Sequence, residues 1–249
     1  MQRIGVLCFL IFILFWSCEP KETEAMIQDR LDNARKYGLE ENYEKAIQII
    51  DDVIADYPDY PGSYVLGASY MSVQPNLRQE AIKYLNKAIN INPNDYEAYL
   101  LRGQIKTGYE GLIDLNKAID LNPLDAGIFY ARGQQKTQLN NYYGALDDFH
   151  KALELDNFRS VEIKSSLYGD IALAKIQLSE YSEALEEIDK AILLNSLDPT
   201  IYYVRYIYYS KIGELELAKE DLKNAEMLGL IEIMDVVGIN SIPKFELKQ

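Results

Sequence analysis

The chain has 249 residues, of which 48% are hydrophobic and 26% charged, enough for one large domain or two small ones. Its 25 Lys and Arg against 39 Asp and Glu give a formal net charge of −14. This argues against a nucleic acid or an anionic lipid surface as partner, because both require basic side chains to neutralise phosphate. The two cysteines, Cys8 and Cys18, lie in the first 18 residues, which excludes an internal disulfide or a cysteine-based metal site in the rest of the chain.

The first residues of the chain are expected to direct export. Arg3 supplies a positive charge, and residues 4–16 contain no charged side chain. As a helix this apolar stretch would rise only about 20 Å, short of the roughly 30 Å hydrocarbon core of a bilayer. A short apolar stretch after a basic start is typical of a signal peptide, which we assign to residues 1–17.

The end of this segment carries a possible lipidation site. Ser17-Cys18 resembles the sites of lipoprotein signal peptidases, where a small residue precedes the cysteine that becomes acylated. The resemblance implies a lipid on Cys18, a tether over residues 18–26, and a location in the bacterial cell envelope, at the outer membrane facing the periplasm. Two alternatives remain open: cleavage without lipid attachment, and retention of the segment as an uncleaved anchor.

The remainder of the chain is repetitive. Ala or Gly marks corresponding positions at Ala46, Ala81, Gly111, Ala145, Ala184 and Ala218, with spacings of 35, 30, 34, 39 and 34 residues. Within each copy apolar residues recur at helical spacing, as in Ala145, Phe149, Ala152 and Leu153. This period and pattern resemble the tetratricopeptide repeat, a pair of antiparallel helices. The resemblance implies an all-α, right-handed α-solenoid of about six repeats.

The repeats are expected to divide residues 27–232 at regular intervals. They span residues 27–60, 61–94, 95–124, 125–158, 165–198 and 199–232, and residues 233–249 form a C-terminal capping tail. Asn92-Pro93 and Asn122-Pro123 should each end a helix, because proline disfavours the helical conformation of the preceding residue. Asp198-Pro199 should begin a helix, as an N-cap followed by proline in the first turn.

The repeats also differ from one another in length. The third is four residues shorter than the period, about one helical turn, and the second has extra loop residues around Pro75. Before the fifth repeat, residues 158–164 add about five residues.

Residues that could support catalysis are scarce. His150, the only histidine, falls one step off the buried stripe of its helix, so we expect it to face solvent. With one histidine and no cysteine after residue 18, a nucleophilic triad or a zinc site lacks supporting residues. Adjacent acids such as Asp147-Asp148 and Glu186-Glu187 are expected to be solvated charges. The sequence therefore predicts a protein that is not an enzyme and has no metal or cofactor. Arg102 and Arg132 are expected to be structural.

A partner is expected on the concave side of the solenoid, which the first helices of the repeats line. The expected groove residues are Tyr64, Leu100, Gln104, Tyr130, Gln134, Gln138, Tyr203, Ile207 and Lys211. Tyrosine offers a rigid apolar face with a hydroxyl, and glutamine can pair with a peptide backbone. This favours a protein or peptide partner.

Tyrosines are most concentrated in residues 201–209. Tyr202 and Tyr209 fall on expected core positions, and aromatic residues at helical spacing usually form core. The alternative is an aromatic platform of Tyr203 and Tyr208 for a peptide or a sugar.

These features predict a non-catalytic scaffold of the cell envelope that holds a partner protein and helps to assemble or localise a complex. One alternative is an accessory glycan-binding lipoprotein that uses the groove tyrosines. A lesser one is an outer-membrane biogenesis factor that resembles pilotins or barrel-assembly lipoproteins.

Overall fold

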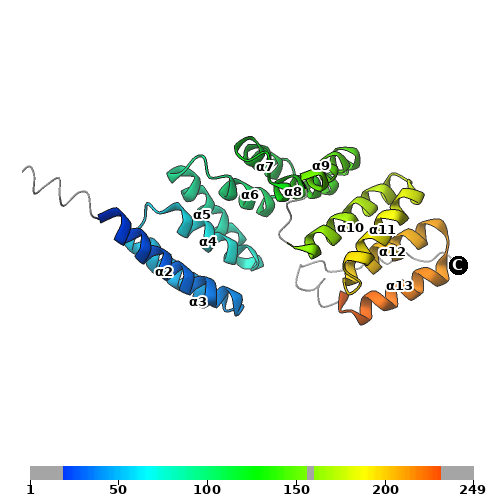
Figure 1. Ribbon diagram of the computed structural model, residues 1–249, viewed down its shortest axis with the longest axis horizontal. Helices are drawn as coiled ribbons and strands as arrows, with labels where there is room; N and C mark the ends of the chain where they lie inside the picture. Colours follow the sequence, from blue (N-terminus) through cyan, green and yellow to red (C-terminus); the bar gives the residue numbers. More distant parts are fainter. Residues whose placement is uncertain (1–18, 156–159, 231–249) are drawn as a thin grey trace, which may run out of the picture. The chain divides into compact units, whose positions relative to one another are not determined.

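A computed structural model describes residues 19–155 and 160–230 of the chain (Figure 1). Cys18, the expected signal peptide and the expected capping tail lie outside these described residues, so those assignments stay predictions. No helix among the described residues is both long and apolar enough to cross a bilayer.

The described residues form twelve α-helices and one short 3-10 helix, and they contain no β-strand. The helices are α2 (Glu19–Leu39), α3 (Tyr43–Asp56), α4 (Pro61–Ser72), α5 (Arg78–Ile91), α6 (Tyr96–Ile105), α7 (Tyr109–Leu121), α8 (Ala126–Gln138), α9 (Tyr142–Leu155), α10 (Val161–Gln177), α11 (Tyr181–Leu194), α12 (Pro199–Ile212) and α13 (Leu215–Met227), with η1 (Pro75–Leu77) before α5. Consecutive helices pair into six hairpins, so the expected all-α fold of about six repeats is confirmed.

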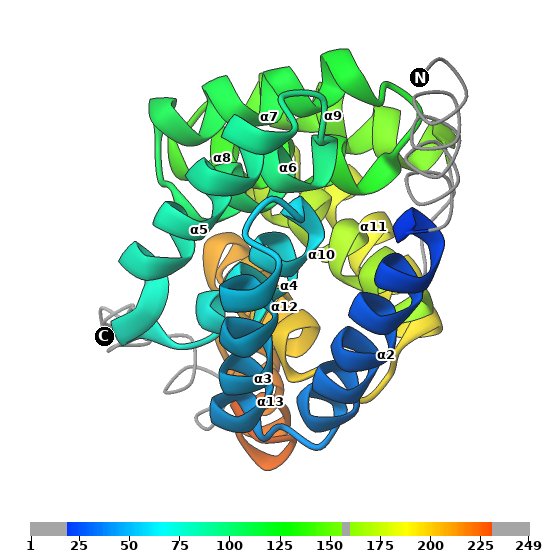
Figure 2. The same cartoon turned by 90° about the vertical axis from the view of Figure 1, so that its left-hand side faces the viewer.

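The chain divides into two compact units, and the division falls inside α6, between Leu101 and Arg102. Unit 1 holds the hairpins α2/α3 and α4/α5. Unit 2 holds the C-terminal part of α6 and the helices α7 to α13. Within each unit the second helix of a hairpin packs along the first, as Figures 1 and 2 show for α2 with α3 and for α8 with α9.

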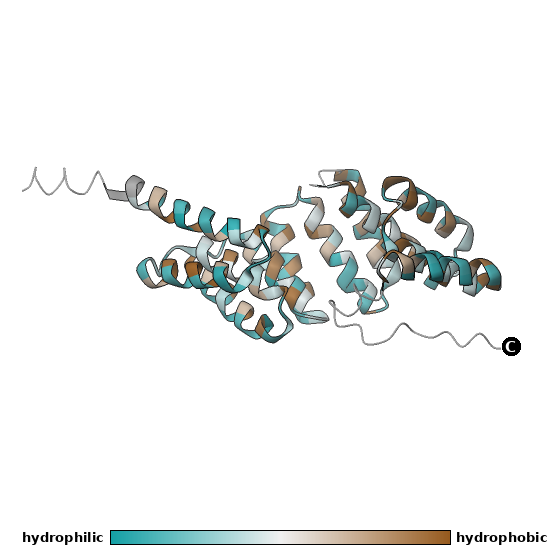
Figure 3. Cartoon of the chain, turned by 90° about the horizontal axis from the view of Figure 1, so that it is seen from below, coloured by the Kyte–Doolittle hydropathy of each residue, from teal (hydrophilic) through white to brown (hydrophobic). Residues whose placement is uncertain are grey.

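The core of unit 1 is built from one apolar stripe on each helix. Ile27 and Leu31 of α2 meet Ile50 and Val53 of α3, and all four are buried. Figure 3 shows the corresponding alternation of hydrophobic and hydrophilic residues along the helices. These stripes are what an amphipathic helix against a core requires.

In unit 2 a glycine permits close helix packing. Phe149 of α9 is fully buried, and a Cβ added at Gly133 of α8 would collide with its ring. Leu167 and Ile171 of α10 pack in the same cluster, which joins the fourth hairpin to the fifth. Gly133 therefore lets α8 and α9 approach closely.

The proline-based helix boundaries are confirmed. α5 ends at Ile91 and α7 at Leu121, each followed by asparagine and proline. At the start of α12, the Asp198 carboxylate accepts a hydrogen bond from the backbone N–H of Thr200 at 2.9 Å, with Pro199 in the first turn.

Residues 19–26, which were assigned to the tether, belong to a helix. α2 begins at Glu19, so residues 19–26 are helical rather than an extended tether. Proline is tolerated in the first turn of a helix, and the Lys, Glu and Ala that follow are good helix formers.

The shortened third repeat has a shortened first helix, and a buried amide compensates for it. α6 has 10 residues, against 13 in α8. Gln135 of α8 is buried, and its Oε1 accepts a hydrogen bond from the N–H of Gly108 at 3.1 Å. Its Nε2 donates to the carbonyl of Lys106 at 3.1 Å. Gln135 thus satisfies backbone groups in the turn that replaces the missing helical residues.

Candidate functional site

An ion pair joins the first helix to the second in each hairpin of unit 2. The pairs are Arg102–Asp114 at 2.6 Å, Arg132–Asp148 at 2.6 Å, Lys175–Glu187 at 3.4 Å and Arg205–Asp221 at 2.7 Å. We call these four pairs the interhelix clasps. Three of them are two-pronged, because Nε and Nη2 of the arginine donate to the two carboxylate oxygens.

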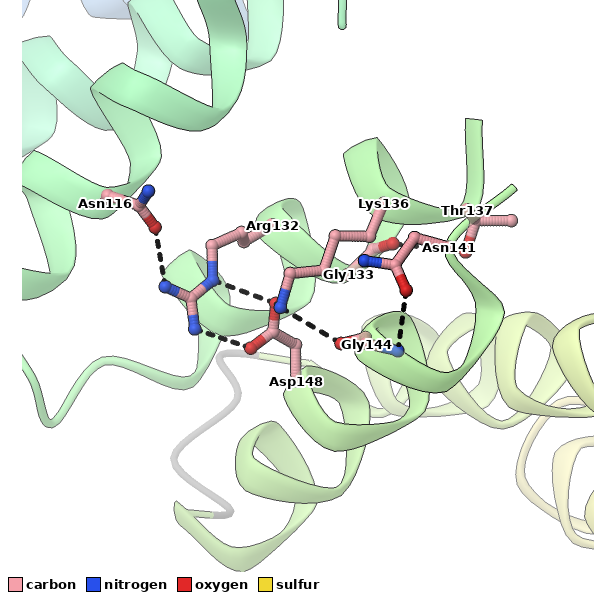
Figure 4. A network of polar contacts seen from close by, with 8 residues as sticks. All are labelled: Asn116, Arg132, Gly133, Lys136, Thr137, Asn141, Gly144 and Asp148. Carbon is pink, nitrogen blue, oxygen red and sulfur yellow. Dashed lines mark hydrogen bonds and ion pairs between the residues drawn. The ribbon is translucent and has the colours of Figure 1, made fainter. Parts of the chain in front are cut away.

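Figure 4 shows the clasp of the fourth hairpin. Asp148 accepts from Arg132 and also pairs with Lys136 at 2.7 Å, and a further nitrogen of Arg132 donates to Asn116 at 2.7 Å. The Lys136 ammonium also donates to the carbonyl of Gly144 at 3.1 Å. The cations of this first helix therefore face the hairpin interior and hold α8 to α9.

These clasps correct one expectation and confirm another. Asp148 and Glu187 were expected to be solvated, but both are buried and ion-paired. Each stands next to a core residue, Phe149 or Ile188, on the side of its helix that faces the first helix. The structural role expected for Arg102 and Arg132 is confirmed.

His150 is exposed on α9, as expected. Within the described part of the chain, no group of three or more His, Cys, Asp or Glu side chains is arranged to hold a metal ion.

Of the expected groove residues, two lie in unit 1. Tyr64 is only 7% exposed, and its hydroxyl donates to the carbonyl of Pro58 at 2.9 Å. Its ring packs edge-on against Tyr84 of α5. Tyr64 is therefore part of the core, and its assignment to a binding surface is wrong, because the preceding loop folds over its hydroxyl. Leu100 is half-buried.

The expected groove residues of unit 2 are more accessible. Gln104, Gln134, Gln138 and Lys211 are exposed, and Tyr130, Tyr203 and Ile207 are half-buried. Ile207 packs on the core cluster of the last two hairpins.

The tyrosine cluster of α12 is mostly packing. Ile201, Val204 and Tyr208 form a buried stripe at helical spacing, so Tyr208 cannot form a surface platform with Tyr203. Tyr203 stacks on Tyr206 with ring centroids 5.5 Å apart and contacts the buried Leu230. Burial and the neighbouring Tyr206 raise the pKa of Tyr203 to about 12.

The expected core positions Tyr202 and Tyr209 are only half-buried. The Tyr202 hydroxyl instead donates to the carbonyl of Ser196 at 3.0 Å, near the start of α12.

Two expected groove residues meet at a carboxylate that sequence reasoning missed. Gln134 Nε2 donates to Asp170 of α10 at 3.0 Å, and the Tyr130 hydroxyl also hydrogen-bonds to Asp170. α10 contacts both α8 and α12. We call Tyr130, Gln134, Gln138 and Asp170 the first-helix surface of unit 2.

The electrostatics of Asp170 are unusual for an aspartate. Burial raises the pKa of the Asp170 carboxyl, the hydrogen bonds from Gln134 and Tyr130 lower it, and the nearby negative charge of Asp198 raises it, with a net increase. Burial and the Asp170 carboxylate likewise raise the pKa of Tyr130, so its hydroxyl stays protonated and donates.

A comparison between repeats could have found Asp170. It stands two residues before Ala172. The residues at the equivalent position of four other first helices are apolar: Val65, Leu101, Ala131 and Val204. In the first hairpin the equivalent Asp32 is exposed. Four of the six first helices have an apolar residue at this position, so a half-buried acid there is a signal that a search for catalytic motifs does not register.

Comparison with known sequences and structures agrees with this architecture. A sequence profile described as tetratricopeptide repeat matches residues 76–95, which include all of α5. The recognised repeat segment thus lies in the second hairpin. No curated protein matches the chain.

Similar solved structures extend over most of the repeats. A structure of the APC/C hetero-tetramer Cut9–Hcn1 matches with a TM-score of 0.73 at 16% identity, covering 89% of this chain and 46% of that one. This chain thus spans less than half the length of that protein. PilW, described as a widely conserved type IV pilus biogenesis factor, matches with a TM-score of 0.71 at 14% identity, covering 87% and 99%. At these identities the likeness establishes the fold.

A third structure is relevant to the site. YrrB, described as a tetratricopeptide-repeat protein with an unusual peptide-binding site, matches with a TM-score of 0.52 at 18% identity, covering 77% of this chain and 98% of that one.

Proposed function

We propose that this protein is a non-catalytic scaffold that binds an extended segment of a partner protein along the first-helix surface of unit 2. The observation that carries the proposal is the arrangement of that surface. Exposed amides of Gln134 and Gln138 stand one turn apart on α8, beside the half-buried ring of Tyr130. Amides can pair with the backbone of an extended chain, and a tyrosine ring adds rigid contact area.

The orientation of the basic side chains and the stacking of the repeats support this proposal. The Lys and Arg side chains of the clasps are turned into the hairpins, which leaves the amides of Gln134 and Gln138, the ring of Tyr130 and the Asp170 carboxyl on the first-helix surface. Stacked helical repeats offer extended surfaces of this kind to partner segments. The peptide-binding site described for YrrB is consistent with such a use of the fold.

We further propose that the scaffold acts in the bacterial cell envelope, held by a lipid on Cys18 at the outer membrane and facing the periplasm. The support is the basic start and short apolar stretch of residues 1–17, followed by Ser17-Cys18. The similarity to PilW makes a role in assembling an envelope complex the more specific version of this proposal.

The glycan-binding alternative has less support. Tyr208 is buried, and Tyr203 packs against Tyr206 and Leu230. Their rings therefore do not form the open stacking platform that a sugar requires.

Site-specific photocrosslinking in intact cells tests the scaffold proposal. A photoreactive residue in place of Gln138 should give a discrete protein adduct. The same residue in place of His150, which is exposed on the second helix α9, serves as the matched control and should give none. Equal labelling from both positions, or no protein adduct from Gln138, would contradict the proposal.

The envelope location has its own test. Cys18→Ala should abolish incorporation of a labelled fatty acid and release the chain from the membrane fraction. A variant that keeps its label and stays in the membrane fraction would show that Cys18 is not the anchor.

A further inference from the structure

We propose that the first-helix surface of unit 2 selects a partner segment with a Lys or Arg side chain, and that Asp170 is the residue that receives this cation. This inference rests on the proposed function, because it specifies the chemistry of the segment that the scaffold binds.

The placement of Asp170 is the first support. The neighbouring first helices carry apolar residues at the equivalent position, and Ala131 and Val204 are buried there. An aspartate at this position loses hydration, and the resulting cost is visible in its raised pKa. Where a residue breaks a rule that its neighbours keep, a functional site is the expected reason.

The charge balance of the surrounding helices is the second support. Arg132 and Lys136 of α8, Lys175 of α10 and Arg205 of α12 all pair with carboxylates of second helices. Within the described residues Asp170 takes part in no ion pair, and the charge that shifts its pKa is the negative charge of Asp198. The surface therefore has a negative potential that a cation from outside would complement.

The remaining hydrogen-bonding capacity of Asp170 is the third support. An ionised carboxylate offers about four acceptor positions, and Gln134 and Tyr130 occupy two of them. An ammonium or guanidinium group can use the others. The half-buried ring of Tyr130 provides an apolar wall for the methylene stem of a lysine or arginine.

A purely structural role is the competing explanation, in which Asp170 only ties α10 to α8 through its two hydrogen bonds. The two roles differ in what the removal of the charge does. Asp170→Asn keeps an oxygen that can accept from Gln134 or Tyr130, so a structural tie would survive in large part. A cation receptor would be lost.

Peptide binding decides between these roles. The purified chain is titrated with capped heptapeptide pools whose central residue is Lys, Arg, norleucine or Glu, with the other positions randomised. The Lys and Arg pools should bind at least about tenfold more tightly than the norleucine pool, and the Glu pool should bind most weakly. Asp170→Asn should abolish this preference, so that the Lys, Arg and norleucine pools bind alike.

Two further variants complete the experiment. Asp147→Asn makes the same chemical change at an exposed position of α9 and should keep the full preference. Asp170→Glu keeps the charge and should retain a preference for Lys and Arg. Tight binding of the pools without preference for a cation would overturn this inference and leave the scaffold proposal standing. Failure of the wild-type chain to bind any pool would overturn both.

Discussion

The two units hold the same kind of helix hairpin together by different contacts. In unit 2 the interhelix clasps place a carboxylate of the second helix, 3 to 10% exposed, against a cation of the first. In unit 1 the ion pair between a first and a second helix is Arg30–Asp56, which lies at the surface with side chains 32% and 59% exposed.

In unit 1, Tyr84 takes the corresponding place in the second hairpin, and Tyr70 joins the first hairpin to the second. The ring of Tyr84 covers Gly67 within the α4/α5 hairpin, and its hydroxyl donates to Asp51 of α3 at 2.5 Å. Tyr70 covers Gly38 of α2 and contacts the ring of Tyr43. A tyrosine combines a large apolar area with one hydrogen bond, and it incurs no cost of burying a charge.

The comparison shows that the same hairpin geometry can be held by buried ion pairs or by tyrosine contacts. The two kinds of contact respond differently to a substitution that removes one partner. A buried ion pair adds little net stability, but the loss of one partner leaves an uncompensated buried charge. An aromatic contact loses stability in proportion to the area removed. Unit 2 should therefore respond strongly to the change of a single charge, and unit 1 should not.

The largest effect is expected for Asp148→Ala in unit 2. The change leaves Arg132 and Lys136 without their carboxylate, and the expected loss is about 3–5 kcal/mol in the free energy of unfolding. Denaturant unfolding measures the total loss, and amide hydrogen exchange in α8 and α9 locates it. In unit 1 the matched change Asp56→Ala removes an exposed partner and should cost about 0–1 kcal/mol. Equal losses in the two variants would remove the distinction between the units.

The clasps also show how far the sequence predicts this fold. The repeat period and the asparagine–proline boundaries predicted the hairpins, because both depend on local spacing. The burial of Asp148 depends on an arginine 16 residues earlier in the chain. The helical periodicity of the sequence does not identify that arginine as its partner. The arginine itself was recognised as structural, but its acidic partner was not.

The binding surface was predictable in part for a similar reason. Tyr130 and Gln134 were placed on it from their positions within one helix. Asp170 was missed, because its hydrogen bond with Gln134 forms only when α10 lies beside α8. Tyr64 was misplaced, because the carbonyl of Pro58 in the preceding loop accepts its hydroxyl proton. Contacts between different helices or with a loop, rather than helix periodicity, decide the roles of Asp170 and Tyr64.

The next largest effect is expected for Gln135→Leu, also in unit 2. The leucine removes the acceptor for the Gly108 N–H and the donor to the Lys106 carbonyl, and unpaired buried backbone groups cost about 1–3 kcal/mol. Denaturant unfolding should show this loss, and amide exchange should accelerate first around Gly108. The same substitution at Gln177, which is exposed on α10, should change the stability by about 0.5 kcal/mol or less. A loss that is just as large at Gln177 would mean that the short turn does not depend on Gln135.

A smaller effect is expected for Tyr84→Phe in unit 1. The change keeps the ring over Gly67 and removes the hydrogen bond to Asp51, so the expected loss is about 0.5–1.5 kcal/mol. Tyr84→Ala removes the ring as well and should cost clearly more. If the two variants lose the same stability, the hydrogen bond to α3 rather than the ring over Gly67 supplies the stabilisation, and the contrast with unit 2 becomes weaker.

The smallest effect on stability is expected for Asp170→Asn, and it is a gain rather than a loss. Because burial raises the pKa of Asp170 above that of an unfolded aspartate, its ionised form destabilises the folded state at any pH above the unfolded pKa. That cost disappears as the pH falls through the raised pKa and Asp170 takes up a proton. Asp170→Asn should therefore unfold at a higher temperature than wild type near about pH 8, and the difference should shrink toward about pH 4.

Thermal unfolding followed by circular dichroism across this pH range measures the difference. Asp147→Asn, at an exposed position of α9, should show no such pH-dependent gain. A less stable Asp170→Asn at neutral pH would mean that the charge of Asp170 supports the fold. Greater stability together with the loss of Lys and Arg selectivity would instead mean that unit 2 tolerates an unfavourable charge because a cationic partner needs it.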